Sequence, residues 1–222
     1  MISHKLRRLW AKFWMYFSGL GFFGRIATRI AMLFAPPHSG CRYLARANSK
    51  GYISPRATVY HANLKLGAHI FIGDRVTIFQ DKNGGEVEIG ERVHLYGDTF
   101  IQTGAGGSIK IGADTHIQSW CQFSAYKGNI IVGSYVQIAP RCSFYPYAHD
   151  FAPGELIMKQ GLKTKGNIII EDDVWLGCGV IVLDGIRIGK GAVVGAGSVV
   201  THDIPAGSIA AGIPARIIKM RS

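Results

Sequence analysis

The stretch IIIEDDVWLGCGVIVLDGIRIGKGAVVGAGSVV, residues 168–200, places an aliphatic side chain at every sixth position. A period of six matches neither the 3.6-residue turn of an α-helix nor the two-residue alternation of a β-strand. Three periods make about 18 residues, which is one lap of a coil with three short strands and three corners. The aliphatic side chains then point to the coil axis, and the next lap covers them about 4.8 Å away. They are Ile170, Leu176, Val182, Ile188, Val194 and Val200.

The same period extends toward the N-terminus in longer laps. Six repeated segments each hold an aliphatic residue at their third position, and these residues are 17, 22, 21, 38 and 18 residues apart. The longer spacings predict segments that leave the coil, the largest at 148–167. Glycine, at 29 residues, is abundant, and we expect it to supply the corner conformations. The sequence therefore predicts an all-β fold, a parallel β-helix over 51–205 with one inserted loop and a tail at 206–222. The aligned segments are IFIGDRV (70–76), VEIGERV (87–93), IKIGADT (109–115), IIVGSYV (130–136), IIIEDDV (168–174) and IRIGKGA (186–192).

The net charge of +11 belongs to the N-terminal third of the chain. Residues 1–73 hold eleven Lys or Arg and no Asp or Glu, whereas residues 74–222 hold fourteen of each sign. Over 5–34, apolar side chains recur at helical spacing with cations on the other side. We therefore expect residues 1–50 to form a basic amphipathic helical arm. Its apolar side chains are Leu6, Leu9, Trp10, Phe13, Trp14 and Phe17, and its cations include Lys5, Arg8 and Lys12.

Three partners could explain this arm. Its longest uncharged run, 13–24, is 12 residues, short of the about 20 that span a bilayer, and no signal-peptide cleavage site follows it. A basic helix with aromatic side chains suits the surface of an anionic membrane, but a helix that packs on the coil would show the same apolar face. Because no nucleic-acid motif accompanies the charge, we expect no nucleic-acid partner. We expect a cytoplasmic protein, peripheral on the inner face of the membrane if the arm binds lipid.

The four cysteines, Cys41, Cys121, Cys142 and Cys178, contain no CxxC pair. An even count is compatible with two disulfides, but a repeat coil of this size needs no such cross-links. We favour buried free thiols in a reducing compartment.

The repeat resembles that of the hexapeptide-repeat acyltransferases over roughly residues 52–220. Residues 130–220 are similar to the sugar O-acetyltransferases of the galactoside, maltose and nodulation-factor type, and the tail VVGAGSVVTHDIPAGSIAAGIPARIIKM (193–220) carries the most specific match. The resemblance implies a left-handed β-helix, a homotrimer, and acetyl-CoA bound in a groove between neighbouring subunits. The left hand rests on the resemblance alone, because parallel crossovers are ordinarily right-handed.

The repeat breaks at FYPYAHDFAP (144–153), which contains His149. In the similar enzymes a histidine precedes the large loop, and acetyl transfer from a thioester to a hydroxyl needs a base near neutral pH. The resemblance thus implies that His149 is the catalytic base. We assign Ser119, Gln122 and Asp150 to the acceptor side, although the stretch SWCQFSA lacks an asparagine that the family has there. We expect the group that orients His149 to come from elsewhere in the chain, not from the adjacent Asp150.

The resemblance also implies that the later coils bind acetyl-CoA. Glycine and alanine at the corners would let the donor approach the backbone, or would simply pack the corners. Cations after the GIP motif would face the phosphates, which Lys and Arg bind strongly. The implied residues are Trp175 and Cys178 beside the pantetheine arm, Gly195 and Ala196 at the backbone, Thr201 near the adenine, and Arg216 and Lys219 at the phosphates.

Two further histidines, His94 and His116, occupy the same place in successive laps, IGERVH and IGADTH, and we expect them to stack. Carbonic anhydrases built on this helix bind a metal through three histidines, and no third histidine is in register here, so we predict no metal. We predict an acetyl-CoA-dependent O-acetyltransferase of a sugar hydroxyl, on a surface polysaccharide or its lipid-linked precursor. An N-acetyltransferase of an amino sugar, a non-catalytic scaffold and a metal-dependent hydratase remain open alternatives.

Overall fold

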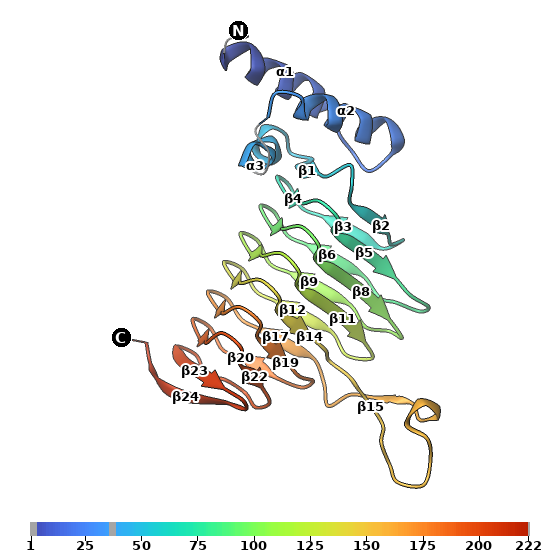
Figure 1. The fold of residues 1–222 in the computed structure, drawn as a ribbon, viewed down its shortest axis with the longest axis vertical. Helices are drawn as coiled ribbons and strands as arrows, with labels where there is room; N and C mark the ends of the chain where they lie inside the picture. Colours follow the sequence, from blue (N-terminus) through green and yellow to red (C-terminus); the bar gives the residue numbers. More distant parts are fainter. Residues whose placement is uncertain (1–3, 36–38, 222) are drawn as a thin grey trace.

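The body of the molecule is a left-handed parallel β-helix capped at one end by helices (Figure 1). The computed structural model describes residues 4–35 and 39–221. Each lap of the coil contributes one short strand to each of three flat sheets, which we call faces A, B and C. The predicted all-β fold with a helical arm and one inserted loop is confirmed.

Face A holds the first strand of each lap and ends in an antiparallel pair. Its strands are β1 (Tyr52–Ile53), β4 (Phe71–Ile72), β7 (His94–Leu95), β10 (His116–Ile117), β13 (Gln137–Ile138), β18 (Trp175–Leu176), β21 (Val193–Val194), β23 (Ser208–Gly212) and β24 (Ala215–Met220).

Faces B and C hold the second and third strands of each lap. Face B consists of β2 (Thr58–Tyr60), β5 (Thr77–Gln80), β8 (Phe100–Gly104), β11 (Gln122–Tyr126), β14 (Ser143–Phe144), β19 (Ile181–Val182) and β22 (Val199–Val200). Face C consists of β3 (Leu64–Leu66), β6 (Val87–Ile89), β9 (Ile109–Ile111), β12 (Ile130–Val132), β17 (Ile168–Ile170) and β20 (Arg187–Ile188).

The six-residue period works because every lap sends hydrophobic side chains inward from each face. In the third lap they include Leu95, Ile101 and Ile111, all essentially fully buried. Full burial of such a side chain contributes about 1.5–3 kcal/mol, so the stacked rows stabilise the coil. The registers Ile89↔Ile111 and Ile111↔Val132 confirm the predicted stacking of these laps.

The sequence alignment assigns the first repeated segment, 70–76, to the wrong face of the coil. It equates Ile72 with Ile89, but Ile72 pairs with Leu95 on face A, and Leu66 is the residue that pairs with Ile89 on face C. The lap from Leu66 to Ile89 is 23 residues long, because the turn after β5 is extended. All three faces of a lap follow the same six-residue period, so the sequence does not distinguish one face from another. The 17 residues from Ile72 to Ile89 therefore resemble one full lap of about 18 residues.

Glycine contributes to the corners in two ways. Ten glycines in the described residues have positive φ, as predicted, and Gly191 at +67° is one of them. Twelve non-glycine residues in the same described ranges also have positive φ, and Arg92 at +55° and Asp114 at +56° are two of them. The glycine of the IG pairs has another role, because it permits close stacking of laps. A Cβ atom on Gly112 would lie 2.5 Å from the carbonyl carbon of Gly133 in the next lap.

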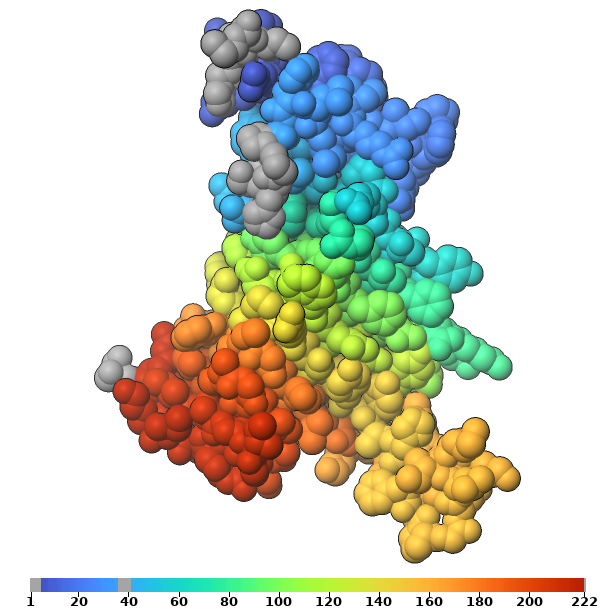
Figure 2. Space-filling model, in the orientation of Figure 1, coloured from blue at the N-terminus to red at the C-terminus, as the bar shows by residue number. Residues whose placement is uncertain are grey.

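The arm forms three helices rather than one continuous helix: α1 (His4–Tyr16), α2 (Phe22–Met32) and α3 (Ser39–Ala47). They lie across the N-terminal end of the coil (Figures 1 and 2). Met15 and Leu44 are fully buried in a cluster that also includes Tyr52 and Phe71 of the first two laps. Packing on the coil, one of the open alternatives, therefore does occur.

All four cysteines are free thiols in the structure. Cys41, Cys121 and Cys142 are buried, as expected, but Cys178 is exposed. The difference follows from position, because Cys121 and Cys142 point into the coil whereas Cys178 lies on a corner between faces A and B.

Candidate active site

The inserted loop projects from the body beyond the end of β14 (Figures 1 and 2). The chain leaves the coil after Phe144, forms an antiparallel pair between β15 (Ala148–His149) and β16 (Leu162–Lys163), and returns at β17. The loop tip carries a short 3₁₀ turn at Ile157–Lys159. His149 pairs with Leu162 at the base of this hairpin, and its side chain is exposed. The imidazole is therefore held outside the coil on a defined backbone, where a substrate can reach it.

Asp150 is engaged within the same loop. Its carboxylate accepts hydrogen bonds from Lys163 Nζ at 3.0 Å and from the backbone N–H of Phe151 at 2.9 Å. The bond from Lys163 is the main reason that the pKa of Asp150 lies below its ordinary value. The carboxylate thus has partners other than the imidazole of His149, in line with the expectation that Asp150 does not orient it.

The two other acceptor-side candidates occupy different places. Gln122 lies on the outer surface of face B, between Phe100 and Ser143 of the neighbouring laps. Ser119 lies on the corner between faces A and B, where its carbonyl accepts from the N–H of Arg141 at 3.1 Å. Gln122 therefore shares a face with the strand that leads to His149, and Ser119 lies at the far edge of that face.

Two tyrosines beside the loop were not singled out from the sequence. The rings of Tyr126 and Tyr147 lie 5.3 Å apart, and the Tyr147 hydroxyl is 3.3 Å from Ser124 Oγ. Gln102 Nε2 donates to the Tyr126 hydroxyl at 2.7 Å. Together they make an aromatic and hydrogen-bonding surface on face B, a combination that suits a sugar. The signal that could have found it is the alternation of Gln122, Ser124 and Tyr126 in one strand.

Several donor-site candidates gather on the corner between faces A and B. In successive laps the residues at this corner are Ser119, Pro140, Cys178 and Ala196. A backbone hydrogen bond joins the last two laps there, from the N–H of Gly197 to the Cys178 carbonyl at 2.8 Å. We call this column the A–B edge. Trp175 precedes it on face A with a side chain that is 55% exposed.

The glycine at this edge has a packing reason. A Cβ atom on Gly195 would lie 2.8 Å from the Cβ atom of Ala211 in β23. This contact accounts for a glycine at 195 by packing alone, and donor binding at Gly195 stays a prediction. The neighbouring Ala196 is exposed and leaves the backbone of the edge accessible.

Arg216 and Lys219 lie on β24, the terminal strand of face A. Lys219 pairs with Ile209 and Arg216 with Ala211, and both side chains are exposed. Within residues 4–35 and 39–221 neither cation has a carboxylate partner. Two uncompensated cations on the terminal strand of face A could bind the phosphates of a nucleotide-containing ligand.

Thr201 and His149 lie on the other side of face B. Thr201 directly follows β22, and its hydroxyl is 2.9 Å from Nδ1 of His202. The loop that carries His149 leaves from the same side, after β14. One six-residue side is at most about 20 Å long, so within one chain face B separates His149 from the A–B edge. The structure thus groups the donor candidates Trp175, Cys178 and Ala196 without bringing them to His149.

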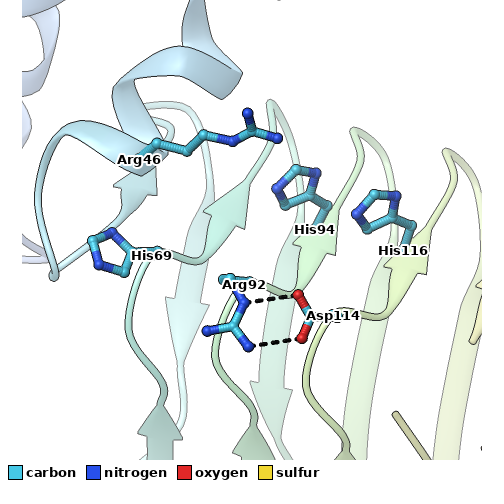
Figure 3. Close-up of a pocket in the computed structure, with 6 residues that line it drawn as sticks. All are labelled: Arg46, His69, Arg92, His94, Asp114 and His116. Carbon is cyan, nitrogen blue, oxygen red and sulfur yellow. Dashed lines mark hydrogen bonds and ion pairs between the residues drawn. The ribbon is translucent and has the colours of Figure 1, made fainter. Parts of the chain in front are cut away.

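The predicted histidine stack is present. The rings of His94 and His116 are 4.4 Å apart and 2° from parallel, so this expectation is confirmed. Figure 3 shows them in a cavity of about 340 Å³ that also contains His69 and the bidentate pair of Arg92 with Asp114, both N–O distances being 2.7 Å. Burial, followed by the charges of His116 and nearby arginines, lowers the pKa of His94 to about 4.

His69 is a third histidine that lines the same cavity, from a corner and not from a strand. His69 and Arg92 occupy equivalent corner positions in successive laps. The N–H of Arg92 donates to the carbonyl of Ala68, the residue before His69. Among the residues that the structure describes, no group of three His, Cys, Asp or Glu side chains is arranged to hold a metal ion. The lowered pKa of His94 keeps its own ring neutral at ordinary pH, so the charges that line the cavity are those of Arg46, Arg92 and Asp114.

Comparison with known proteins begins with the coil itself. Residues 167–202 match the bacterial transferase hexapeptide model, which consists of six repeats. This part of the chain is similar to the hexapeptide-repeat transferases. The matched repeats contain Trp175, Cys178 and the A–B edge of the last laps, and they begin where the inserted loop ends.

Two relatives match part of this chain. Galactoside O-acetyltransferase of Lactococcus lactis subsp. lactis is 43% identical over 89 residues, covering 40% of this chain and 42% of the relative. A 2,3,4,5-tetrahydropyridine-2,6-dicarboxylate N-acetyltransferase of Staphylococcus aureus is 54% identical over 55 residues, covering 25% and 23%. The chain thus spans less than half the length of these curated relatives.

Two solved structures share the fold over more of the chain. A candidate acetyltransferase from Bacillus cereus is 26% identical and has a TM-score of 0.60, over 75% of this chain and 85% of that one. A hexapeptide-repeat acetyltransferase from Vibrio cholerae, solved with acetyl coenzyme A, is 21% identical with a TM-score of 0.50, over 98% and 88%.

Proposed function

We propose that this hexapeptide-repeat protein is an acetyl-CoA-dependent O-acetyltransferase of a sugar hydroxyl. The observation that carries the proposal is His149, which is exposed at the base of a hairpin that leaves the coil. The identity shared with a galactoside O-acetyltransferase supports the same class of acceptor. A surface polysaccharide or its lipid-linked precursor is the acceptor we favour.

In this mechanism His149 accepts the proton of the acceptor hydroxyl while the oxygen attacks the thioester carbonyl carbon. The tetrahedral intermediate then collapses, its carbon–sulfur bond breaks, and the thiolate of CoA takes the proton from the imidazolium. Backbone N–H groups would hold the oxyanion. The aromatic surface of Tyr126 and Tyr147, with Gln122 beside it, would hold the sugar on face B.

The donor would lie along the A–B edge. Trp175 offers an exposed ring, Cys178 and Ala196 leave the backbone open, and Arg216 with Lys219 supplies charge for the phosphates. These groups fit an extended ligand with an apolar arm and an anionic end. Because face B separates them from His149, a complete site requires a neighbouring subunit, which is why we propose a homotrimer.

The test is acetyl transfer by wild type and by His149→Ala, measured as CoA release with a panel of sugars. Removal of a general base reduces kcat by about 10²–10⁴-fold. We expect that loss for His149→Ala with unchanged acetyl-CoA affinity by calorimetry. Met158→Ala, at the exposed loop tip, is the matched control and should retain activity. Activity of His149→Ala within tenfold of wild type would overturn the assignment.

An N-acetyltransferase is the second candidate, favoured by the 54% identity with an N-acetyltransferase over 55 residues. The panel should therefore pair each sugar with the amino sugar that differs at one position. Transfer only to the amino sugars would replace the O-acetyl proposal. Failure of wild type to bind acetyl-CoA at all would favour a non-catalytic coil.

A further inference from the structure

The helical cap presents an apolar surface that does not face the coil. Successive side chains on an α-helix are about 100° apart, so Leu9 and Phe13 lie on one side of α1 and Ala11 and Met15 on the opposite side, while Phe17 follows in the turn after the helix. Ala11 and Met15 are the buried ones. The packing of α1 therefore uses its small apolar face and leaves the larger aromatic face in solvent.

The exposed surface continues into α2. Phe22 and Phe23 begin that helix and are 74% and 83% exposed, while Phe13 on α1 is 60% exposed. Their rings contact one another in pairs, Phe13 with Phe17 at 5.5 Å and Phe22 with Phe23 at 5.6 Å. We call the side chains of Leu9, Phe13, Tyr16, Phe17, Phe22 and Phe23 the cap face.

The helices that carry the cap face are fixed to the coil. Trp10 Nε1 donates to the carbonyl of Ile30 at 2.9 Å and joins α1 to α2. A guanidinium nitrogen of Arg25 donates to the carbonyls of Pro55 and Ala57 in the first lap at 3.2 and 2.9 Å. Exposure of the phenyl rings is thus a property of the folded cap and not of a loose arm.

The charge around the cap face indicates what kind of partner it binds. Residues 4–50 contain nine Lys or Arg and no Asp or Glu, and Lys5 and Lys12 flank the aromatic side of α1 at helical spacing. None of the nine has a carboxylate partner among the residues that the structure describes. Two copies that met through this surface would bring like charges together, and a nucleic-acid duplex would leave the phenyl rings in water.

We propose that the cap face docks on the surface of an anionic lipid bilayer. The aromatic side chains would insert at the boundary between headgroups and acyl chains, where Trp, Tyr and Phe are favoured. The flanking cations would contact anionic headgroups, each contributing about 1 kcal/mol near such a surface. No helix in the described residues is long and apolar enough to span a bilayer, so docking is peripheral.

The experiment is flotation of the full chain with two kinds of vesicle, phosphatidylcholine alone and phosphatidylcholine with about one third phosphatidylglycerol. Wild type should bind the anionic vesicles at least about tenfold more tightly, and high salt should weaken this binding. Phe13→Gln, Phe17→Gln and Phe22→Gln combined should weaken it roughly tenfold or more, with unchanged circular dichroism and Tm.

Tyr60→Gln is the matched control, because Tyr60 is 69% exposed in the first lap but lies off the cap face. It should bind vesicles like wild type. Equal binding by the triple variant would overturn the proposal, as would no binding by wild type. Two further outcomes would overturn it in favour of another partner: an oligomer that dissociates in the triple variant, or tight binding of single-stranded RNA without vesicle binding. None of these results bears on acetyl transfer.

Discussion

The pairing of Asp150 with Lys163 predicts a modest role for that carboxylate. Asp150→Asn removes an exposed ion pair, and such pairs contribute about 0–1 kcal/mol to stability. We expect Tm to change little and kcat/KM for acetyl transfer to fall less than about threefold, because the imidazole of His149 keeps its position on β15. A loss near that of His149→Ala would show instead that Asp150 orients the base.

Burial of His94 predicts a loss of stability in acid. The folded pKa, about 4, is below the ordinary value of 6.5, so between these values the unfolded chain binds more protons than the folded chain. The free energy of unfolding is therefore highest above pH 6.5 and falls as the pH is lowered toward 4. A shift of this size corresponds to roughly 3 kcal/mol.

Urea unfolding at pH 7.5, 6 and 5 measures this effect. His94→Gln should flatten the dependence of unfolding free energy on pH, and His202→Gln, at an exposed site, should leave it as in wild type. An equally steep decline in His94→Gln would assign the acid sensitivity to other groups. His116, whose pKa is also lowered by burial, is the next group to substitute.

The stacking of His94 on His116 could be predicted from sequence, whereas the entry of His69 into the same cavity could not. The first two side chains occupy the same strand position in successive laps, so the period places them together. His69 lies on a corner, and its direction depends on a backbone with φ of +56° that no periodicity encodes. Side chains on strands were thus predictable, and those on corners were not.

Among the elements, the corner glycines offer a stability test. Gly112→Ala would place a Cβ atom 2.5 Å from Gly133 and 2.6 Å from Ser134 N, which requires the two laps to separate. We expect a loss of about 2 kcal/mol or more in the free energy of unfolding, from urea midpoints. Gly161→Ala has no atom within 4 Å of the added Cβ and should be neutral. Equal effects of both would show that laps are not closely stacked at Gly112.

The helical arm shows why an amphipathic pattern does not identify the buried face. The pattern in α1 is real, but the coil accepts Ala11 and Met15, because small and flexible side chains allow the helix to approach closely. The larger face, with Leu9 and Phe13, stays outside. Periodicity therefore predicted a helix with an apolar side, and only the structure distinguishes the side that packs from the side that remains available.

The molecule as a whole has its candidate chemistry on two edges of one face. Strand periodicity could predict the coil and the position of the inserted loop, but not that face B separates His149 from Trp175 and Ala196. That separation depends on which of three equivalent sides each strand occupies. An acetyltransferase with this arrangement needs two chains at each site, one supplying the base and the other the donor edge.

Complementation between two inactive variants tests this arrangement. His149→Ala lacks the base, and Ala196→Phe blocks the exposed A–B edge, so each alone should transfer no acetyl group above background. Both chains are co-expressed with different tags, and mixed oligomers are purified through both tags. In every mixed cyclic trimer, one interface joins an intact His149 to an intact edge, so activity should recover to about one third of wild type. Mixed oligomers that remain inactive would place the base and the donor edge of each site in the same chain.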